Sequence, residues 1–177
     1  EHINKNELDL ATEKTDSAFK LNSEDNELYL LKGEIEFKKK NYKEASYNLI
    51  TYNTFNPLNP ISWEILGRAQ QEMDKKEGAL KSFDNAYELE PNKNRFLRTV
   101  SLITELHKEE LLEVYLDKFF NRKWNEDFQT TDSLVVANFL VTAQRPELAL
   151  DFYPNVDLDS LSRLDLAKYS LTLQILE

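Results

Sequence analysis

The stretch WEILGRA, residues 63–69, places a glycine in the middle of a segment with helical spacing. A glycine inside a helix costs about 1 kcal/mol relative to alanine, so Gly67 needs a physical reason. A second glycine, Gly33, stands upstream in the similar setting YLLKGEI. The spacing between these two glycines predicts that the chain is built from repeats of about 34 residues.

A shift by this spacing aligns residues of the same kind at six positions along the chain. The aligned pairs are Tyr29 and Trp63, Gly33 and Gly67, Ala45 and Ala79, Leu49 and Phe83, Phe55 and Leu89, and Pro57 and Pro91. Ala11 and Leu21 extend the frame backwards, one repeat ahead of Ala45 and Phe55. We therefore expect the chain to open in the second helix of a truncated repeat.

One repeat carries its residues in the order of a known signature. They are Trp63, Leu66, Gly67, Ala79, Phe83, Ala86 and Pro91. This order resembles the tetratricopeptide repeat, W-x2-L-G-x2-Y followed by A-x3-F and P, with Gln70 in place of the aromatic residue. The preceding repeat is looser, since Lys32 replaces the leucine, Leu49 the phenylalanine and Tyr52 an alanine. The resemblance implies an all-α fold, a right-handed α-solenoid of antiparallel helix pairs.

The residues also predict where the helices begin and end. Apolar residues three and four positions apart predict helices at 27–39, 42–55, 61–73 and 76–89. The turns within the pairs are expected at Lys40-Asn41 and Asp74-Lys75, and we expect Asn41 to take the left-handed conformation that ends a helix. Asn59 suits the cap of a helix that opens with Pro60. We interpret Gly67 as a close-contact point between paired helices, with Ala79 opposite.

Beyond Pro91 the signature weakens, and the frame needs one adjustment. A one-residue deletion near His107 places Leu112, Leu116 and Phe119 on the buried stripe of a divergent third repeat. In a fourth pair we expect Ala137 at the small position, Pro146 opening a short second helix, and Ala149 and Tyr153 on its stripe. A terminal helix capped by Asp157 or Asp159 is expected to carry Leu161, Leu164, Leu171 and Ile175.

The chain is therefore expected to form one continuous array over residues 1–177. Its predicted parts are the second helix of a truncated repeat at 1–24, repeats at 26–59 and 60–93, a divergent repeat at 94–124, and a divergent repeat with a terminal helix at 130–177. Three glycines and five prolines leave few turn signals, which also favours helices over many short strands.

Composition excludes several classes of partner. The formal net charge of −10 argues against nucleic acid, whose binding depends on neutralising phosphates. The longest uncharged run, 133–144, is too short for a membrane span of about 20 residues. The chain has no cysteine, which suits the cytoplasm and the periplasm equally, so the compartment stays open, and no targeting segment is recognisable.

The sequence offers little for catalysis, and we predict that the protein is not an enzyme. Its two histidines, His2 and His107, lack the spacing of a metal site, and no glycine-rich phosphate loop is present. We expect no cofactor and no metal. Four aromatic residues form either a ligand cage or the packing between divergent repeats, and packing is favoured. They are Phe119, Phe120, Trp124 and Phe128.

What remains as a candidate site is a surface. The resemblance implies that the first helix of each pair lines a concave wall that binds protein or peptide partners. Carried over by position, the partner-facing residues are Leu30, Glu34, Phe37, Ile61, Glu64, Arg68, Gln71, Arg95, Arg98 and Leu102, with Glu27 and Glu105 at the ends of the set. Arg68, Arg95 and Arg98 form either a local basic patch or a local balance for nearby carboxylates such as Glu64 and Glu90.

We predict a non-enzymatic interaction module that binds a peptide or partner protein in the concave groove. The mixed charges and apolar residues of this wall indicate an amphipathic segment. Leu30 and Glu34 stand where relatives that hold the acidic tails of chaperones carry lysine and asparagine, so that activity is not supported. The alternative is a regulatory or structural segment of a larger multidomain protein, which positions a substrate or mediates self-association. Fold analogy alone names no partner, and the oligomeric state stays open.

Overall fold

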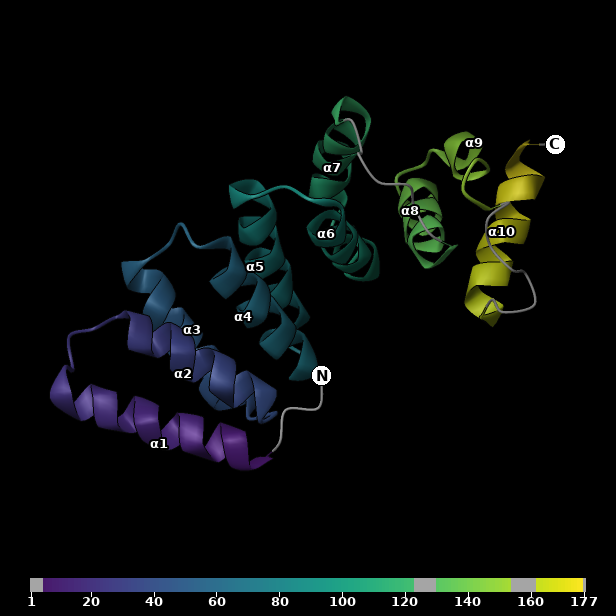
Figure 1. Ribbon diagram of the computed structural model, residues 1–177. Helices are drawn as coiled ribbons and strands as arrows, with labels where there is room; N and C mark the ends of the chain where they lie inside the picture. Colours follow the sequence, from purple (N-terminus) through teal and green to yellow (C-terminus); the bar gives the residue numbers. More distant parts are fainter. Residues whose placement is uncertain (1–4, 123–129, 154–161, 177) are drawn as a thin grey trace. The chain divides into compact units, whose positions relative to one another are not determined.

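The computed structural model describes residues 5–122, 130–153 and 162–176 (Figure 1). Over these residues the chain forms ten helices and no strand. In chain order the helices are α1 (Lys5–Leu21), α2 (Glu27–Lys38), α3 (Tyr42–Phe55), α4 (Pro60–Glu72), α5 (Lys76–Leu89), α6 (Lys93–Glu105), α7 (Glu109–Asn121), α8 (Thr130–Thr142), α9 (Pro146–Ala149) and α10 (Arg163–Leu176). The predicted all-α architecture is confirmed.

The helices belong to two compact units, Glu1–Pro91 and Asn92–Glu177. In the first unit α1 packs on α2, α2 on α3, α3 on α4, and α4 on α5. The pairs α2–α3 and α4–α5 are the two helix pairs that the sequence predicts, and each helix begins and ends within one residue of its expected bounds. The prediction of one continuous array across both units stays a prediction.

Both repeated glycines lie directly against a large side chain of the second helix in their pair. A Cβ atom added to Gly67 would lie 2.7 Å from Cδ1 and Cε1 of the Phe83 ring. A Cβ atom on Gly33 would lie 2.7 Å from Cγ of Leu49 in the same way. The expected close contact is present, but the nearest atoms belong to Phe83, one turn beyond Ala79. The large side chain on the second helix fills the space that the glycine leaves.

In each pair, the turn that follows the first helix contains a residue in the left-handed conformation, and none of these residues is glycine. These residues are Lys40 (φ 64°), Asp74 (φ 57°), His107 (φ 51°) and Gln144 (φ 58°). Lys40 and Asp74 are separated by one full repeat, whereas His107 follows Asp74 one position sooner than the repeat requires. Asn92, the cap of α6, also follows Asn59, the cap of α4, one position sooner than the repeat requires, so the one-residue deletion lies before α6 and not near His107 as predicted.

The left-handed residue at the first turn is Lys40, so the expectation for Asn41 was wrong. Asn41 has φ −85° and instead donates its backbone N–H to the Glu36 carbonyl over 2.9 Å. Lys40 donates its own N–H to the Phe37 carbonyl over 3.0 Å. Together these bonds form a Schellman motif, which satisfies carbonyl groups at the helix end and places the left-handed residue one position before Asn41.

Asn59 caps α4 as the sequence predicts. Its side-chain Oδ1 accepts hydrogen bonds from the backbone N–H groups of Ile61 (3.0 Å) and Ser62 (3.3 Å), and Pro60 follows at the first helical position. The Asn59 Nδ2 also donates to the Tyr52 hydroxyl over 3.0 Å. Tyr52, which replaces an alanine of the signature, thus ties α3 to the start of α4.

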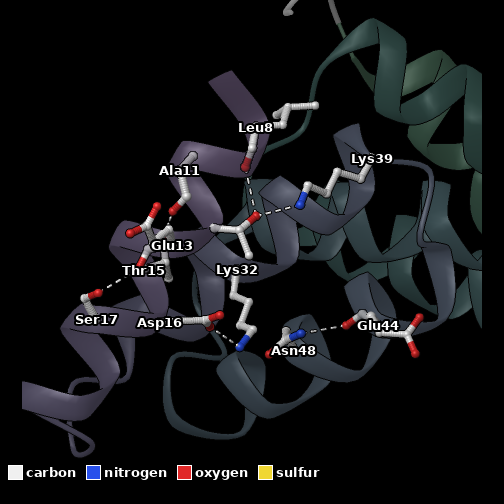
Figure 2. A network of polar contacts seen from close by, with 11 residues as sticks. Leu8, Ala11, Glu13, Thr15, Asp16, Ser17, Lys32, Lys39, Glu44 and Asn48 are labelled. Atoms are coloured by element: carbon white, nitrogen blue, oxygen red, sulfur yellow. Dashed lines mark hydrogen bonds and ion pairs between the residues drawn. The ribbon is translucent and has the colours of Figure 1, made fainter. Parts of the chain in front are cut away.

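Helix α1 is joined to α2 by charged contacts. Lys32 forms an ion pair of 2.7 Å with Asp16, and Lys39, just beyond α2, lies 3.0 Å from Asp9. Figure 2 shows the lysine side chains reaching from the α2 segment toward α1. The Lys32 ammonium group also lies 5.4 Å from the centre of the Phe19 ring. Lysine replaces the leucine of the signature here because its partner is a carboxylate on α1.

The second unit confirms the shifted frame. Leu112, Leu116 and Phe119 of α7 are all buried, and the Phe119 ring stacks on Phe96 of α6 at 5.8 Å between centroids. Phe119 also contacts Phe120 edge-on at 5.2 Å, so Phe119 takes part in packing, whereas Phe120 keeps 54% of its surface exposed. Trp124 and Phe128 lie outside the described residues.

The fourth pair is formed by α8 and the short helix α9. Ala137 and Ala149 are fully buried, Tyr153 is nearly so, and Pro146 opens α9 as expected. In α10 Leu171 is half-exposed, whereas Thr172 is fully buried. Asp157, Asp159 and Leu161, expected at the start of this helix, lie outside the described residues, as do the side chains of Leu164 and Ile175. No helix in the described part of the chain is long and apolar enough to cross a membrane.

Candidate partner-binding surface

In the first unit the predicted partner-facing residues lie on two helices that contact each other, α2 and α4. On α2, Leu30, Glu34 and Phe37 are half-buried. On α4, Glu64 is half-buried, whereas Ile61, Arg68 and Gln71 are exposed, Ile61 with 55% of its surface. All seven retain some surface, and they combine apolar, acidic and basic groups.

Arg68 has specific neighbours on this surface. Its guanidinium group lies 4.8 Å from the centre of the Phe37 ring, a cation–π distance. The Phe37 ring in turn contacts Tyr42 edge-on at 5.6 Å between centroids. Partial burial, and then the hydrogen-bonded Glu72 carboxylate, raise the pKa of the Tyr42 hydroxyl above its ordinary value, while Arg68 acts in the opposite direction. Arg68 therefore bridges the first and second repeats.

The second unit differs from the expectation at two positions. Arg95 is 4% exposed and Leu102 1% exposed, so neither offers surface to a partner. Arg98 and Glu105 are exposed on the same helix, α6. The reason is a shift of the repeat frame: Asn92 caps α6 one position sooner after Asn59 than the repeat requires. Arg95 and Leu102 therefore occupy the places of Ser62 and Ala69, which are buried on α4 as well. The proposed grouping of Arg68 with Arg95 and Arg98 joins residues of different units and stays a prediction.

A cavity of about 570 Å³ lies within the second unit, between α6, α8 and α10. Its lining residues are Ser101, Thr104, Glu105, His107, Val135, Asn138 and Lys168. These come mainly from first helices and from the terminal helix. Several of these residues are polar, and Glu105 and Lys168 carry opposite charges. We call this cavity the second-unit groove.

Of the residues that line this groove, only Glu105 was predicted from the sequence to face a partner. In the shifted frame of α6, Ser101 and Thr104 occupy the places that Arg68 and Gln71 have on α4, so two small side chains replace two large ones. That difference was a usable signal for a cavity. Lys168 could not be predicted as a lining residue, because the repeat frame does not extend to its helix, α10.

Metal binding has no support in the described part of the chain. No group of three or more histidine, aspartate or glutamate side chains comes together there in a way that could hold an ion. His107 is exposed and occupies the left-handed turn after α6. The second-unit groove and the exposed residues of the first helices offer hydrogen-bonding and charged side chains that can contact a partner.

Comparison with known proteins gives similarity at the level of structure. No protein-family model matches the sequence. No curated protein matches it either. Among solved structures, PilF of Pseudomonas aeruginosa superimposes with a TM-score of 0.67 at 18% identity, over 93% of this chain and 74% of that one. MamA superimposes with a TM-score of 0.66 at 13% identity, over 96% and 93%.

A third structure, the thermophilic TPR protein TTC0263 of Thermus thermophilus, gives a TM-score of 0.47 at 18% identity, over 96% of this chain and 92% of that one. The first two superpositions show the fold that these chains share with this one, a succession of helix pairs. The chain has the fold of the tetratricopeptide-repeat proteins.

Proposed function

We propose that the protein is a non-enzymatic interaction module that binds a segment of a partner protein on the surface of its first helices. The observation that carries the proposal is the second-unit groove, a cavity of about 570 Å³ bounded by three helices. A volume of this size accommodates several side chains of a peptide. The partner in this proposal is a protein or peptide, as the sequence predicts.

The groove favours a segment that carries both charges. Glu105 and Lys168 line it together with the hydroxyl groups of Ser101 and Thr104. A partner with one basic and one acidic residue complements both charged groups, whereas a purely acidic segment leaves Glu105 opposed by like charge. The exposed Ile61 on α4 adds an apolar contact in the first unit. An amphipathic segment of mixed charge therefore fits both surfaces best.

The test is affinity capture with charge-reversed variants. We expect Glu105→Lys and Lys168→Glu each to lose proteins that the wild type captures. Asp117→Lys and Lys14→Glu, which reverse exposed charges outside the groove, serve as matched controls and should retain them. Circular dichroism must show unchanged helix content in all four variants. Recovery of the same proteins by wild type and groove variants would show that the groove is not the binding site.

A further inference from the structure

The first unit holds a cavity of about 350 Å³ that the proposed function does not use. It lies between α3, α4 and α5, and its lining includes Asn53, Trp63, Leu66, Gln70, Lys81 and Ser82. The α4 contributors, Trp63, Leu66 and Gln70, lie on the side of that helix opposite Ile61 and Arg68, because successive residues turn by about 100°. The cavity is therefore separate from the predicted partner-facing surface.

The cavity exists where the chain departs from the repeat signature. The signature has an aromatic residue three positions after Gly67, and this chain has Gln70. The Gln70 Oε1 accepts a hydrogen bond of 2.7 Å from the Ser82 hydroxyl, which fixes the amide. Gly78 leaves room for it, since a Cβ there would lie 3.1 Å from the Gln70 Nε2. The volume of an aromatic ring is thus missing beside Trp63 and Leu66.

One buried polar group in this cavity has no partner. Asn53 is 5% exposed, and its Nδ2 makes no hydrogen bond within the described structure. Its Oδ1 is close to the Ser62 hydroxyl, which also reaches the Asn59 carbonyl at 2.8 Å. Ser62 satisfies only one of the two polar atoms of the amide, whichever way round the amide lies. An unsatisfied buried amide is costly, and an occupant with a backbone N–H and C=O would satisfy it.

The cavity is lined by a basic residue and no acidic one, whereas the chain as a whole is acidic. None of its lining residues is acidic, although the chain has 32 aspartate and glutamate residues. Its one charged lining residue is Lys81, which is exposed and forms no ion pair with the described residues. A cation beside an apolar recess is complementary to a carboxylate next to a large apolar side chain.

We propose that this cavity is a second docking site that takes the tyrosine or phenylalanine ring of an acidic peptide segment. The ring fills the space beside Trp63 and Leu66 that the signature aromatic would occupy. The peptide backbone pairs with the amide of Asn53, and a neighbouring carboxylate pairs with Lys81. The groove of the second unit plays no part in this contact.

The experiment is a titration followed by nuclear magnetic resonance, with the capped dipeptide acetyl-Asp-Tyr-amide as the probe. We expect saturable shifts of the Trp63 indole N–H and of the Asn53 and Gln70 side-chain amides. Acetyl-Asp-Ala-amide, which lacks the ring, should leave these signals unmoved. Acetyl-Lys-Tyr-amide, which reverses the charge, should bind several-fold more weakly. Equal shifts with all three probes, or none with the first, would overturn the proposal.

Two variants locate the contact. Gln70→Tyr restores the signature aromatic and should abolish binding by filling the cavity while the helix content is retained. Lys81→Glu changes an exposed residue and should invert the preference between the Asp-Tyr and Lys-Tyr probes, which keeps the test decisive where Gln70→Tyr fails to fold. Asp117→Lys, which reverses an exposed charge outside both cavities, should bind the Asp-Tyr probe like wild type. Unchanged binding by Lys81→Glu would contradict the docking site, and this result is independent of the groove.

Discussion

The Phe83 ring occupies the place that a side chain on Gly67 would need, since an added Cβ would lie 2.7 Å from two ring carbons. Phe83 is fully buried, so the ring has no open space into which it can turn. Leu49 stands in the same relationship to Gly33, one repeat earlier. Gly67 therefore destabilises its own helix, α4, but allows α5 to pack closely against it through Phe83.

Replacing this glycine should destabilise the first unit. We expect Gly67→Leu to lower the free energy of unfolding by about 1 to 3 kcal/mol through overpacking. Urea denaturation followed by circular dichroism measures the change. Gly78→Ala is the control, because its nearest neighbour is the end of the Gln70 side chain at 3.1 Å, and it should have a smaller effect. An unchanged urea midpoint for Gly67→Leu would mean that the Phe83 ring moves aside without loss of stability, and it would contradict overpacking at this contact.

The cap of α4 should make a measurable contribution to stability. Asn59→Ala removes the acceptor of two backbone N–H groups, and we expect a loss of about 0.5 to 2 kcal/mol in the free energy of unfolding. Lys75→Ala is a matched control, since Lys75 precedes α5 without a side-chain cap bond. Chemical denaturation of both variants gives the comparison. Equal losses from the two substitutions would contradict a specific capping role.

The raised pKa of Tyr42 predicts a dependence of stability on alkaline pH. A folded-state pKa above the ordinary 10.0 means that folding favours the protonated hydroxyl. The resulting stabilisation is present at neutral pH and is lost as the pH rises from about 10 through the folded-state pKa. Tyr42→Phe cannot ionise, so its stability relative to wild type should increase over this range.

Denaturation midpoints at a series of pH values above neutral measure this effect. Tyr47→Phe is the control, because Tyr47 is 69% exposed on α3 and its replacement should leave the pH dependence of the wild type intact. Parallel pH curves for Tyr42→Phe and wild type would contradict the raised pKa of Tyr42, which arises from burial and then from Glu72.

Arg95 and Arg98 should respond differently to charge reversal, although both lie on α6 within one turn of each other. Arg95→Glu places a carboxylate at a site that is 4% exposed, and we expect a loss of roughly 3 to 5 kcal/mol in the free energy of unfolding. Arg98→Glu changes an exposed side chain and should cost much less. Thermal unfolding distinguishes the two variants. Comparable losses would show that Arg95 is accessible to water in solution.

The helix pairs could be predicted closely because local signals agree with one another. Asn59 and Pro60 fix the start of α4, and the register of Leu112, Leu116 and Phe119 reveals that the frame has shifted by one residue before α7. The identity of the left-handed residue could not be predicted from propensity. The Schellman bonds select Lys40 by its position in the turn, although asparagine is the better left-handed residue.

The candidate site was only partly predictable. A repeat frame assigns a residue to one face of a helix, but a one-residue shift of the frame moves that residue to another face. On α6 the frame is shifted, so Arg95 and Leu102, predicted to face a partner, are buried like Ser62 and Ala69. Lys168 has no recognised frame position and nevertheless lines the second-unit groove.

By itself, the sequence determined that this protein is an all-helical chain with a repeat of about 34 residues, because glycine, alanine and proline spacing acts over short distances. Tertiary structure alone decided that Phe83 closes on Gly67, that α6 is covered on two sides, and that Gln70 leaves a cavity beside Trp63. These features arise when side chains distant in sequence compete for the same volume. Spacing along the chain does not record the outcome of that competition.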